Sequence, residues 1–429
     1  MSDTNKTGAK KSFLDGITAA IMKIAGPMGK FSQLPSVSSI QDGLVSIMPA
    51  IIVGSLFLII SLLGSDSIGS SGKAIIPALA PYVNLLSNVN SMTMGFIGFY
   101  AAITISLSYG EKLELDIKQS ALIGVITFIF INFDRPVDNM ISVKYFGSLG
   151  MFVSIITSLC SIRIFKFFID KNIVIKLPAS VPPNVGNAFT TLIPMLVITS
   201  LAWIIRSVLG FDFPAFMEIF LTPLLSASDS FIVFFLFIFL IMVLWSVGLN
   251  GPAMLSAIIT PINTMALANN AAAKMAGEAL PNIWTETFLF SYIWVASIFP
   301  LLLLMLFSKS KAFKAVSIAS FPAAIFNIIE PTVFGMPIVL NIYLMIPFII
   351  SGTVGPCVAY LLTKVGFISP AFAALPWATP PFMSSFISTG DWKVFLVQAL
   401  VFALGLIIYI PFFKMYEGIE MKQGEERVK

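Results

Sequence analysis

A single acidic residue, Glu330, stands within an apolar part of the chain. It follows the apolar run 317–329 and precedes Pro331, and the apolar sequence then resumes as far as Leu362. An ionised carboxylate is costly in apolar surroundings unless it has partners, and a proline frees a backbone carbonyl upstream of it. An acid beside a broken helix therefore predicts a polar binding site. The alternative is an acid in a loop at the edge of the apolar region.

A second polar break follows the apolar run 231–247. The segment 245–252 has the sequence WSVGLNGP, in which glycine, asparagine and proline together end one helix and begin a turn. Asn250 is therefore either a ligand-binding amide, near Trp245 and Gly251, or the cap of the following helix.

Two further segments carry prolines beside side chains that recognise ligands. The sequence LPWATPP at 375–381 has too many prolines for a continuous helix. Its Trp377 either offers an indole face on which a sugar ring packs or anchors the chain at a membrane interface. The sequence VPPNV at 181–185 places Asn184 as a helix cap or as a ligand-binding amide. A carboxylate, an amide and an indole together fit a sugar, because its hydroxyls need paired acceptors.

The composition identifies the kind of element that must position these residues. Of the 429 residues 57% are hydrophobic and 11% are charged, whereas soluble proteins carry about 25% charged residues. This composition excludes a soluble enzyme, a nucleic-acid-binding protein and a disordered chain. The apolar runs are continuous and do not alternate, which favours membrane helices over barrel strands. Histidine is absent and the only two cysteines, Cys160 and Cys357, lie in apolar runs, so we expect no disulfide framework, no metal site and no cofactor.

The sequence predicts an all-α polytopic membrane protein with about ten crossings. Nine continuous apolar runs are expected to span the bilayer, and three apolar segments interrupted by glycine and proline are expected to form re-entrant hairpins or unwound helices. The nine runs are 43–63, 93–108, 119–133, 146–168, 187–209, 231–247, 287–307, 336–362 and 394–413, and the interrupted segments are 249–268, 315–335 and 366–388.

The basic residues predict the orientation. With the N-terminus inside, 249–268 as one crossing and 315–413 as an even number of crossings, 18 lysines and arginines fall on the inner side and five on the outer side. Lys364 and Lys393 stay unassigned. Cytoplasmic loops of membrane proteins carry such an excess, so we expect both termini and the loop at 308–314 in the cytoplasm.

Changes in polarity along the chain predict five regions. An N-terminal cytoplasmic segment is expected to carry an amphipathic helix at the membrane surface, with its apolar side formed by Leu14, Ile17, Ile21 and Ile24. A scaffold and dimerisation domain, a linker, a substrate-binding transport domain and a cytoplasmic tail follow it. Their bounds are 1–42, 43–210, 211–230, 231–413 and 414–429.

Several motifs resemble one known family. The sequence FNIIEPTVFGMPIVLN at 326–341, the LPWATPP and VPPNV segments, and the ending IPFFK at 410–414 are similar to the lactose/cellobiose-type membrane permeases, the enzyme IIC components of the bacterial sugar phosphotransferase system. The resemblance covers about residues 12 to 417.

This resemblance implies a fold, a function and partners. The fold would be the ten-helix enzyme IIC architecture with two re-entrant hairpins, as a homodimer in the bacterial cell membrane. The function would be import of a diglycoside such as cellobiose, chitobiose or lactose, which a separate cytoplasmic enzyme IIB phosphorylates. The sugar-binding residues expected from the motifs are Glu330, Asn250, Asn327, Trp377, Trp245, Gly251 and Asn184.

The sequence departs from the family pattern where chemistry is expected. The pattern Gly-Ile-His-Gly is here Gly248-Leu249-Asn250-Gly251, so the family's histidine is replaced. Asparagine donates and accepts hydrogen bonds but does not titrate. Transport is therefore compatible with the sequence, whereas coupling to phosphoryl transfer, and with it an enzymatic role, stays open. The alternatives are an uncoupled transporter, one with a changed substrate, and a membrane sensor that binds without transporting.

Overall fold

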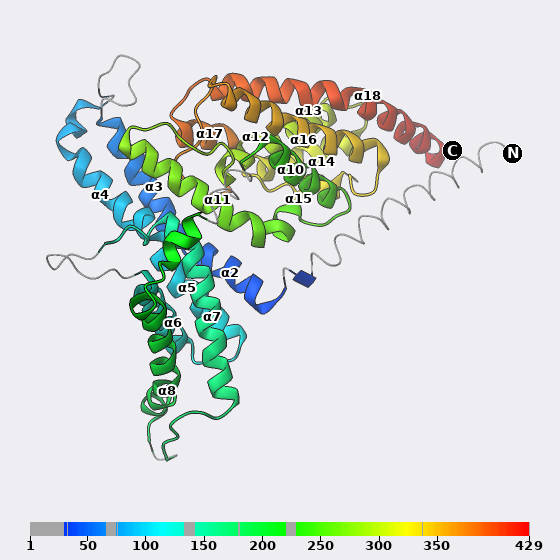
Figure 1. Cartoon of the computed structure of the whole chain (residues 1–429). Coiled ribbons are helices and arrows are strands. Elements are labelled where there is room, and N and C mark those ends of the chain that lie inside the picture. Colours follow the sequence, from blue (N-terminus) through cyan, green and yellow to red (C-terminus); the bar gives the residue numbers. More distant parts are fainter. Residues whose placement is uncertain are drawn as a thin grey trace. The chain divides into compact units, whose positions relative to one another are not determined.

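A computed structural model describes residues 30–31, 33–65, 74, 76–132, 142–178, 181–219, 229–336 and 338–428 (Figure 1). Every regular element in these residues is a helix, so the predicted all-α fold is confirmed. Among the described residues, seven helical stretches are long and apolar enough to cross a membrane, some of them formed by two consecutive helices, and two shorter apolar helices, Ile117–Asn132 and Phe231–Ser246, accompany them. The exact number of crossings stays a prediction.

The chain forms two compact units. The N-terminal unit contains the described residues of Ser32–Ala227 together with Ser256–Ala279, and the C-terminal unit contains those of Met1–Phe31, Ser228–Leu255 and Leu280–Lys429. The second unit therefore begins close to the end of the linker predicted at 211–230. Within that linker residues 213–219 are helical and residues 220–228 lie outside the described ones. The amphipathic helix predicted around Leu14–Ile24 also lies outside them.

The N-terminal unit is built mainly from long apolar helices. Its α-helices are α2 (Pro35–Ser46), α3 (Met48–Leu63), α4 (Val83–Thr93), α5 (Ile97–Lys112), α6 (Ile117–Asn132), α7 (Met151–Asp170) and α8 (Pro183–Trp203), and most of α11 (Gly251–Ala276). Short 3₁₀ or π segments adjoin them at Pro77–Tyr82, Met94–Phe96, Ser148–Gly150 and Ile204–Val208.

Small residues let the helices of this unit approach closely. A Cβ at Gly124 of α6 would lie 1.8 Å from the Ser106 hydroxyl of α5, and one at Gly110 of α5 would lie 2.2 Å from the Ser120 hydroxyl of α6. Close backbone contact through small residues is how helices associate where lipid removes the hydrophobic driving force.

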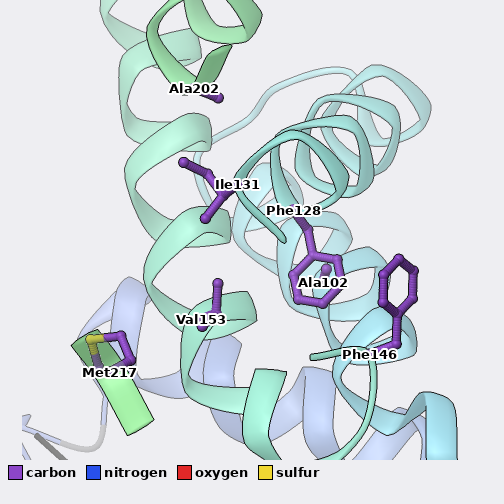
Figure 2. Close-up of a cluster of buried hydrophobic side chains, with 7 residues drawn as sticks. All are labelled: Ala102, Phe128, Ile131, Phe146, Val153, Ala202 and Met217. Carbon is purple, nitrogen blue, oxygen red and sulfur yellow. The ribbon is translucent and has the colours of Figure 1, made fainter. Parts of the chain in front are cut away.

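Aromatic and aliphatic side chains fill the space between these helices. The rings of Phe128 and Phe146 meet edge to face with centroids 5.5 Å apart, a favoured aromatic geometry (Figure 2). The buried cluster around them draws on α5, α6, α7 and α8 and consists of Ala102, Phe128, Ile131, Phe146, Val153, Ala202 and Met217.

The C-terminal unit is built around α12 and contains broken helices. Its α-helices are α10 (Phe231–Ser246), α12 (Glu286–Ser297), α13 (Phe299–Leu306), α14 (Lys311–Ile325), α15 (Glu330–Gly335), α16 (Ile342–Lys364), α17 (Pro381–Thr389) and α18 (Val394–Val428). Helix α12 is buried along almost its whole length and contacts α16, α17 and α18. Helices α16 and α18 pack side by side (Figure 1).

Two of the three predicted interruptions are confirmed and one is wrong. Residues 315–335 contain the break between α14 and α15, and residues 366–388 contain an irregular stretch before α17. Residues 251–268, in contrast, belong to the continuous 26-residue helix α11, which contains Pro261 and begins directly after the turn at 247–250. A proline costs one hydrogen bond, and the alanine-rich sequence 266–273 that follows is a strong helix former.

Candidate functional site

The break between α14 and α15 is a regular helix end with asparagine in place of the usual glycine. Asn327 has φ +63°, the left-handed conformation that asparagine tolerates better than most residues. The backbone N–H of Ile328 donates to Ala323 O at 3.1 Å and that of Asn327 donates to Ala324 O at 2.9 Å, which satisfies the last carbonyls of α14. The chain is thereby redirected within four residues.

Glu330 is the first residue of the short helix α15, followed directly by Pro331. Its carboxylate lies in the first turn, where the helix dipole favours negative charge. The side chain is half-buried, and it has no hydrogen-bond or ion-pair partner among the described residues. This carboxylate therefore keeps its acceptor capacity for a ligand.

Asn327 joins this break to the segment that carries Trp377. Its side chain is buried, and its Nδ2 donates to Trp377 O at 2.6 Å and to Thr379 O at 3.0 Å. Both amide hydrogens are thus committed to backbone carbonyls fifty residues further along the chain. Its Oδ1 is buried and has no hydrogen-bond partner among the described residues.

Trp377 lies in the irregular stretch before α17, as its prolines predict. Its side chain is 48% exposed although its backbone carbonyl is tied to Asn327. A partly exposed indole whose backbone is fixed suits ring stacking, with little conformational freedom left to lose on binding. The structure thus brings Trp377 and the Glu330 break together.

The turn between α10 and α11 lies beside the segment that follows α15. Leu340 N donates to Ser246 O at 3.0 Å, and a Cβ on Gly248 would lie 3.3 Å from the Val339 side chain. Gly248 has φ +83°, so it takes the left-handed position of this turn. The second predicted site region therefore lies near the first.

Asn250 is exposed in that turn and acts as a helix cap. Its Oδ1 accepts a hydrogen bond from Ala253 N at 3.1 Å, the usual pattern at a helix N-terminus. Of the two interpretations of Asn250, the structure supports the helix cap. Its Nδ2 remains available to a ligand hydroxyl.

Trp245 and Gly251 occupy packed positions in the same region. Trp245 is 3% exposed and meets the Trp294 ring edge to face at 6.3 Å, and its indole N–H has no partner among the described residues. A Cβ on Gly251 would lie 2.4 Å from Ile241 O, so glycine is needed for the close approach of α10 and α11. Asn184 is the second residue of α8, in the N-terminal unit.

A half-buried acid holds the start of α10 within the C-terminal unit. The Asp229 carboxylate accepts hydrogen bonds from Ile283 N at 2.9 Å and Trp284 N at 2.6 Å, and the Tyr360 hydroxyl donates to its backbone carbonyl. Burial raises the pKa of Asp229, and the two backbone N–H groups oppose that rise. Asp229 is structural, because both N–H donors come from the loop before α12.

Sequence reasoning missed Gln398, which also holds the Trp377 segment. It is fully buried in α18, and its Nε2 donates to Pro381 O and Ser291 O, both at 3.0 Å. The available signal was a lone amide in the apolar run 394–413. Within the described part of the chain, no three cysteine or acidic side chains gather in a way that would hold a metal ion.

Comparisons with known proteins identify the family to which the chain is similar. Residues 41–352 match the family model described as phosphotransferase system, EIIC. The lichenan permease IIC component of Bacillus subtilis (strain 168) is 31% identical, over 95% of this chain and 94% of that protein. The cellobiose-specific EIIC component of Geobacillus stearothermophilus is 29% identical, over 97% of this chain and 96% of that one.

A solved structure extends the likeness to the fold. The crystal structure of the transporter ChbC, the IIC component from the N,N'-diacetylchitobiose-specific phosphotransferase system, matches with a TM-score of 0.85 and 29% identity. The match covers 94% of this chain and 99% of that one. The resemblance found in the sequence is thereby confirmed. This multi-pass membrane protein belongs to the EIIC family, the sugar permease components of the phosphotransferase system.

Proposed function

We propose that this chain imports a β-linked diglycoside such as cellobiose, chitobiose or lactose across the bacterial cell membrane. The observation that carries the proposal is the bond from buried Asn327 to the Trp377 carbonyl. It joins a segment with an exposed indole to the break that begins with Glu330, whose carboxylate has no partner among the described residues. The relatives named for lichenan, cellobiose and N,N'-diacetylchitobiose support a β-linked sugar.

The chemistry of the site divides sugar recognition among a few side chains. The Glu330 carboxylate accepts hydrogen bonds from sugar hydroxyls, and such charge-assisted bonds are stronger than neutral ones. The Trp377 indole packs against the C–H face of a sugar ring. Asn250 supplies its Nδ2, because its Oδ1 already caps α11. Asn327 has no donor left for the sugar, because both hydrogens of its amide bind carbonyls.

The further assembly follows from the family and from the charge pattern. A cytoplasmic EIIB carries the phosphoryl group to the imported sugar. Both termini face the cytoplasm, as the 18 to five distribution of basic residues indicates. The chain works as a homodimer in which the N-terminal unit is the scaffold and the C-terminal unit carries the sugar.

Glu330→Gln tests the proposed site. The variant keeps the size of the side chain and removes its charge, and each lost charge-assisted hydrogen bond contributes about 1.5–3 kcal/mol. We expect at least tenfold weaker binding of cellobiose or N,N'-diacetylchitobiose to the purified protein by calorimetry. Glu278→Gln changes an exposed acid of the N-terminal unit and serves as the control. Wild-type affinity in Glu330→Gln would place the sugar elsewhere.

A transporter uncoupled from phosphorylation is the second candidate function. The chain has no histidine, and the family's histidine position holds Asn250, an exposed cap that cannot exchange a proton. We expect bare sugar binding to persist while EIIB-dependent uptake is slow. Asn250→His should then raise the phosphorylation-coupled rate in vesicles, since general acid–base assistance typically contributes about 10²–10⁴-fold. Fast coupled uptake by the unaltered protein would exclude this candidate.

Cysteine labelling tests the orientation. In a variant with both native cysteines replaced by serine, Asn5→Cys, Lys311→Cys and Glu425→Cys are each reacted with an impermeant maleimide. We expect no labelling from outside intact cells and full labelling after permeabilisation. Labelling of any of the three in intact cells would reverse the orientation.

A further inference from the structure

The segment 375–381 has few backbone N–H groups with which to form hydrogen bonds within itself. Three of its residues are prolines, Pro376, Pro380 and Pro381, which have no backbone N–H to donate. The bond from Thr379 N to Pro376 O at 2.8 Å closes one turn within it. The rest of the protein can therefore hold this segment through hydrogen bonds to its carbonyl oxygens.

Two buried side-chain amides from distant parts of the C-terminal unit donate hydrogen bonds to those carbonyls. Asn327 Nδ2 binds the carbonyls of Trp377 and Thr379, and Gln398 Nε2 binds that of Pro381. Gln398 also binds Ser291 O in α12, the most buried helix of the unit. The segment is thus fastened on one side to the Glu330 break and on the other to the core.

The side-chain oxygens of both amides accept no hydrogen bond from the described residues. Asn327 Oδ1 and Gln398 Oε1 are buried and without hydrogen-bond partners among the described residues. An orphaned buried polar atom is costly, and a leucine at position 398 would avoid that cost. Packing alone therefore does not account for Gln398, whereas a requirement to fix the carbonyls of this one segment does.

We propose that Gln398, together with Asn327, forms an amide clamp that holds Trp377 in the position required for sugar binding. Gln398 is a positioning residue in this arrangement and touches no sugar. The inference rests on the proposed function, because it assigns a role in the binding of the same sugar. Without the clamp, the segment must be ordered when the sugar binds, and the ordering weakens affinity.

Gln398→Leu tests the clamp, with Asn90→Leu as its matched control. Asn90 is also buried, and its Nδ2 also donates across helices, to Gly54 O at 3.0 Å, but in the N-terminal unit. We expect both variants to lower the melting temperature of the purified protein. Only Gln398→Leu should weaken cellobiose or N,N'-diacetylchitobiose binding, by about tenfold, the size expected from one or two lost hydrogen bonds.

Hydrogen exchange distinguishes a specific effect on the Trp377 segment from a general loss of stability. Amide exchange in peptides covering 372–392 should become faster in Gln398→Leu and not in Asn90→Leu, and saturating sugar should remove the difference. Equal loss of affinity in both variants, or wild-type affinity in Gln398→Leu, would overturn the clamp. If Gln398→Leu does not fold, Gln398→Met keeps a similar length and has no hydrogen-bond donor, and its unchanged affinity would overturn the clamp equally.

The Glu330→Gln variant separates this inference from the proposed function. If Glu330→Gln loses affinity and Gln398→Leu keeps it, the clamp is wrong and the site stands. If both keep wild-type affinity, the sugar does not bind at this site and both proposals fail.

Discussion

Two helix breaks in the C-terminal unit each contain an asparagine followed by a proline, and they use the asparagine in different ways. In the turn between α10 and α11, Gly248 takes the left-handed position and Asn250, two residues later, is exposed and caps the next helix. In the turn between α14 and α15, Asn327 itself takes the left-handed position and its buried side chain reaches the carbonyl of Trp377.

The difference shows how a glycine in the turn changes the role that the asparagine side chain can take. Where glycine supplies the positive φ, the asparagine is free to serve the nearest backbone N–H, as Asn250 does for Ala253. Where no glycine is present, Asn327 supplies the backbone conformation and directs its amide into the interior. One asparagine is therefore local in its effect, and the other joins segments fifty residues apart.

The same substitution at both asparagines gives the largest contrast. Asn327→Asp keeps the left-handed preference but has at most one proton to donate, so at least one of the two buried carbonyls loses a bond that contributes about 1–3 kcal/mol. We expect a large drop in melting temperature and at least tenfold weaker sugar binding. Asn250→Asp keeps a side chain that caps helices as well as asparagine does, and we expect nearly unchanged stability. Similar losses at the two positions would contradict the comparison.

Gly251→Ala tests whether the first turn is held by packing. The new Cβ would lie 2.4 Å from Ile241 O and 2.8 Å from its Cα, so the two helices must separate. Overpacking of this kind costs about 1–3 kcal/mol, and we expect thermal unfolding at a lower temperature. Gly186→Ala, at a site with open space around it, is the control and should melt as the unaltered protein does.

Asn250→Ala should give the smallest measurable loss. It removes the cap of α11, which contributes about 0.5–2 kcal/mol at typical helix N-termini. We expect slightly earlier unfolding and faster amide exchange limited to the first turn of α11. Exchange that also rises in the Trp377 segment would show that Asn250 acts beyond its own helix.

Part of the fold and site follows from the sequence alone. The break at Glu330 and the irregular segment around Trp377 were predicted because proline and left-handed residues act on their immediate neighbours. The break predicted within 249–268 was wrong, because one proline did not outweigh the strong helix propensity of the residues that follow it. The role of Gln398 was not predicted, because the residues next to an amide in an apolar run do not indicate which distant groups it binds.

The sequence by itself determined the membrane setting and the helical class. These depend on hydropathy and on backbone preferences, which act over a few residues. The tertiary structure alone decided which asparagine is a cap and which amides hold the segment of Trp377. Those roles depend on carbonyls supplied from distant parts of the chain, such as Thr379 for Asn327 and Pro381 for Gln398. Hydrogen bonds of this kind exist only once the helices have packed.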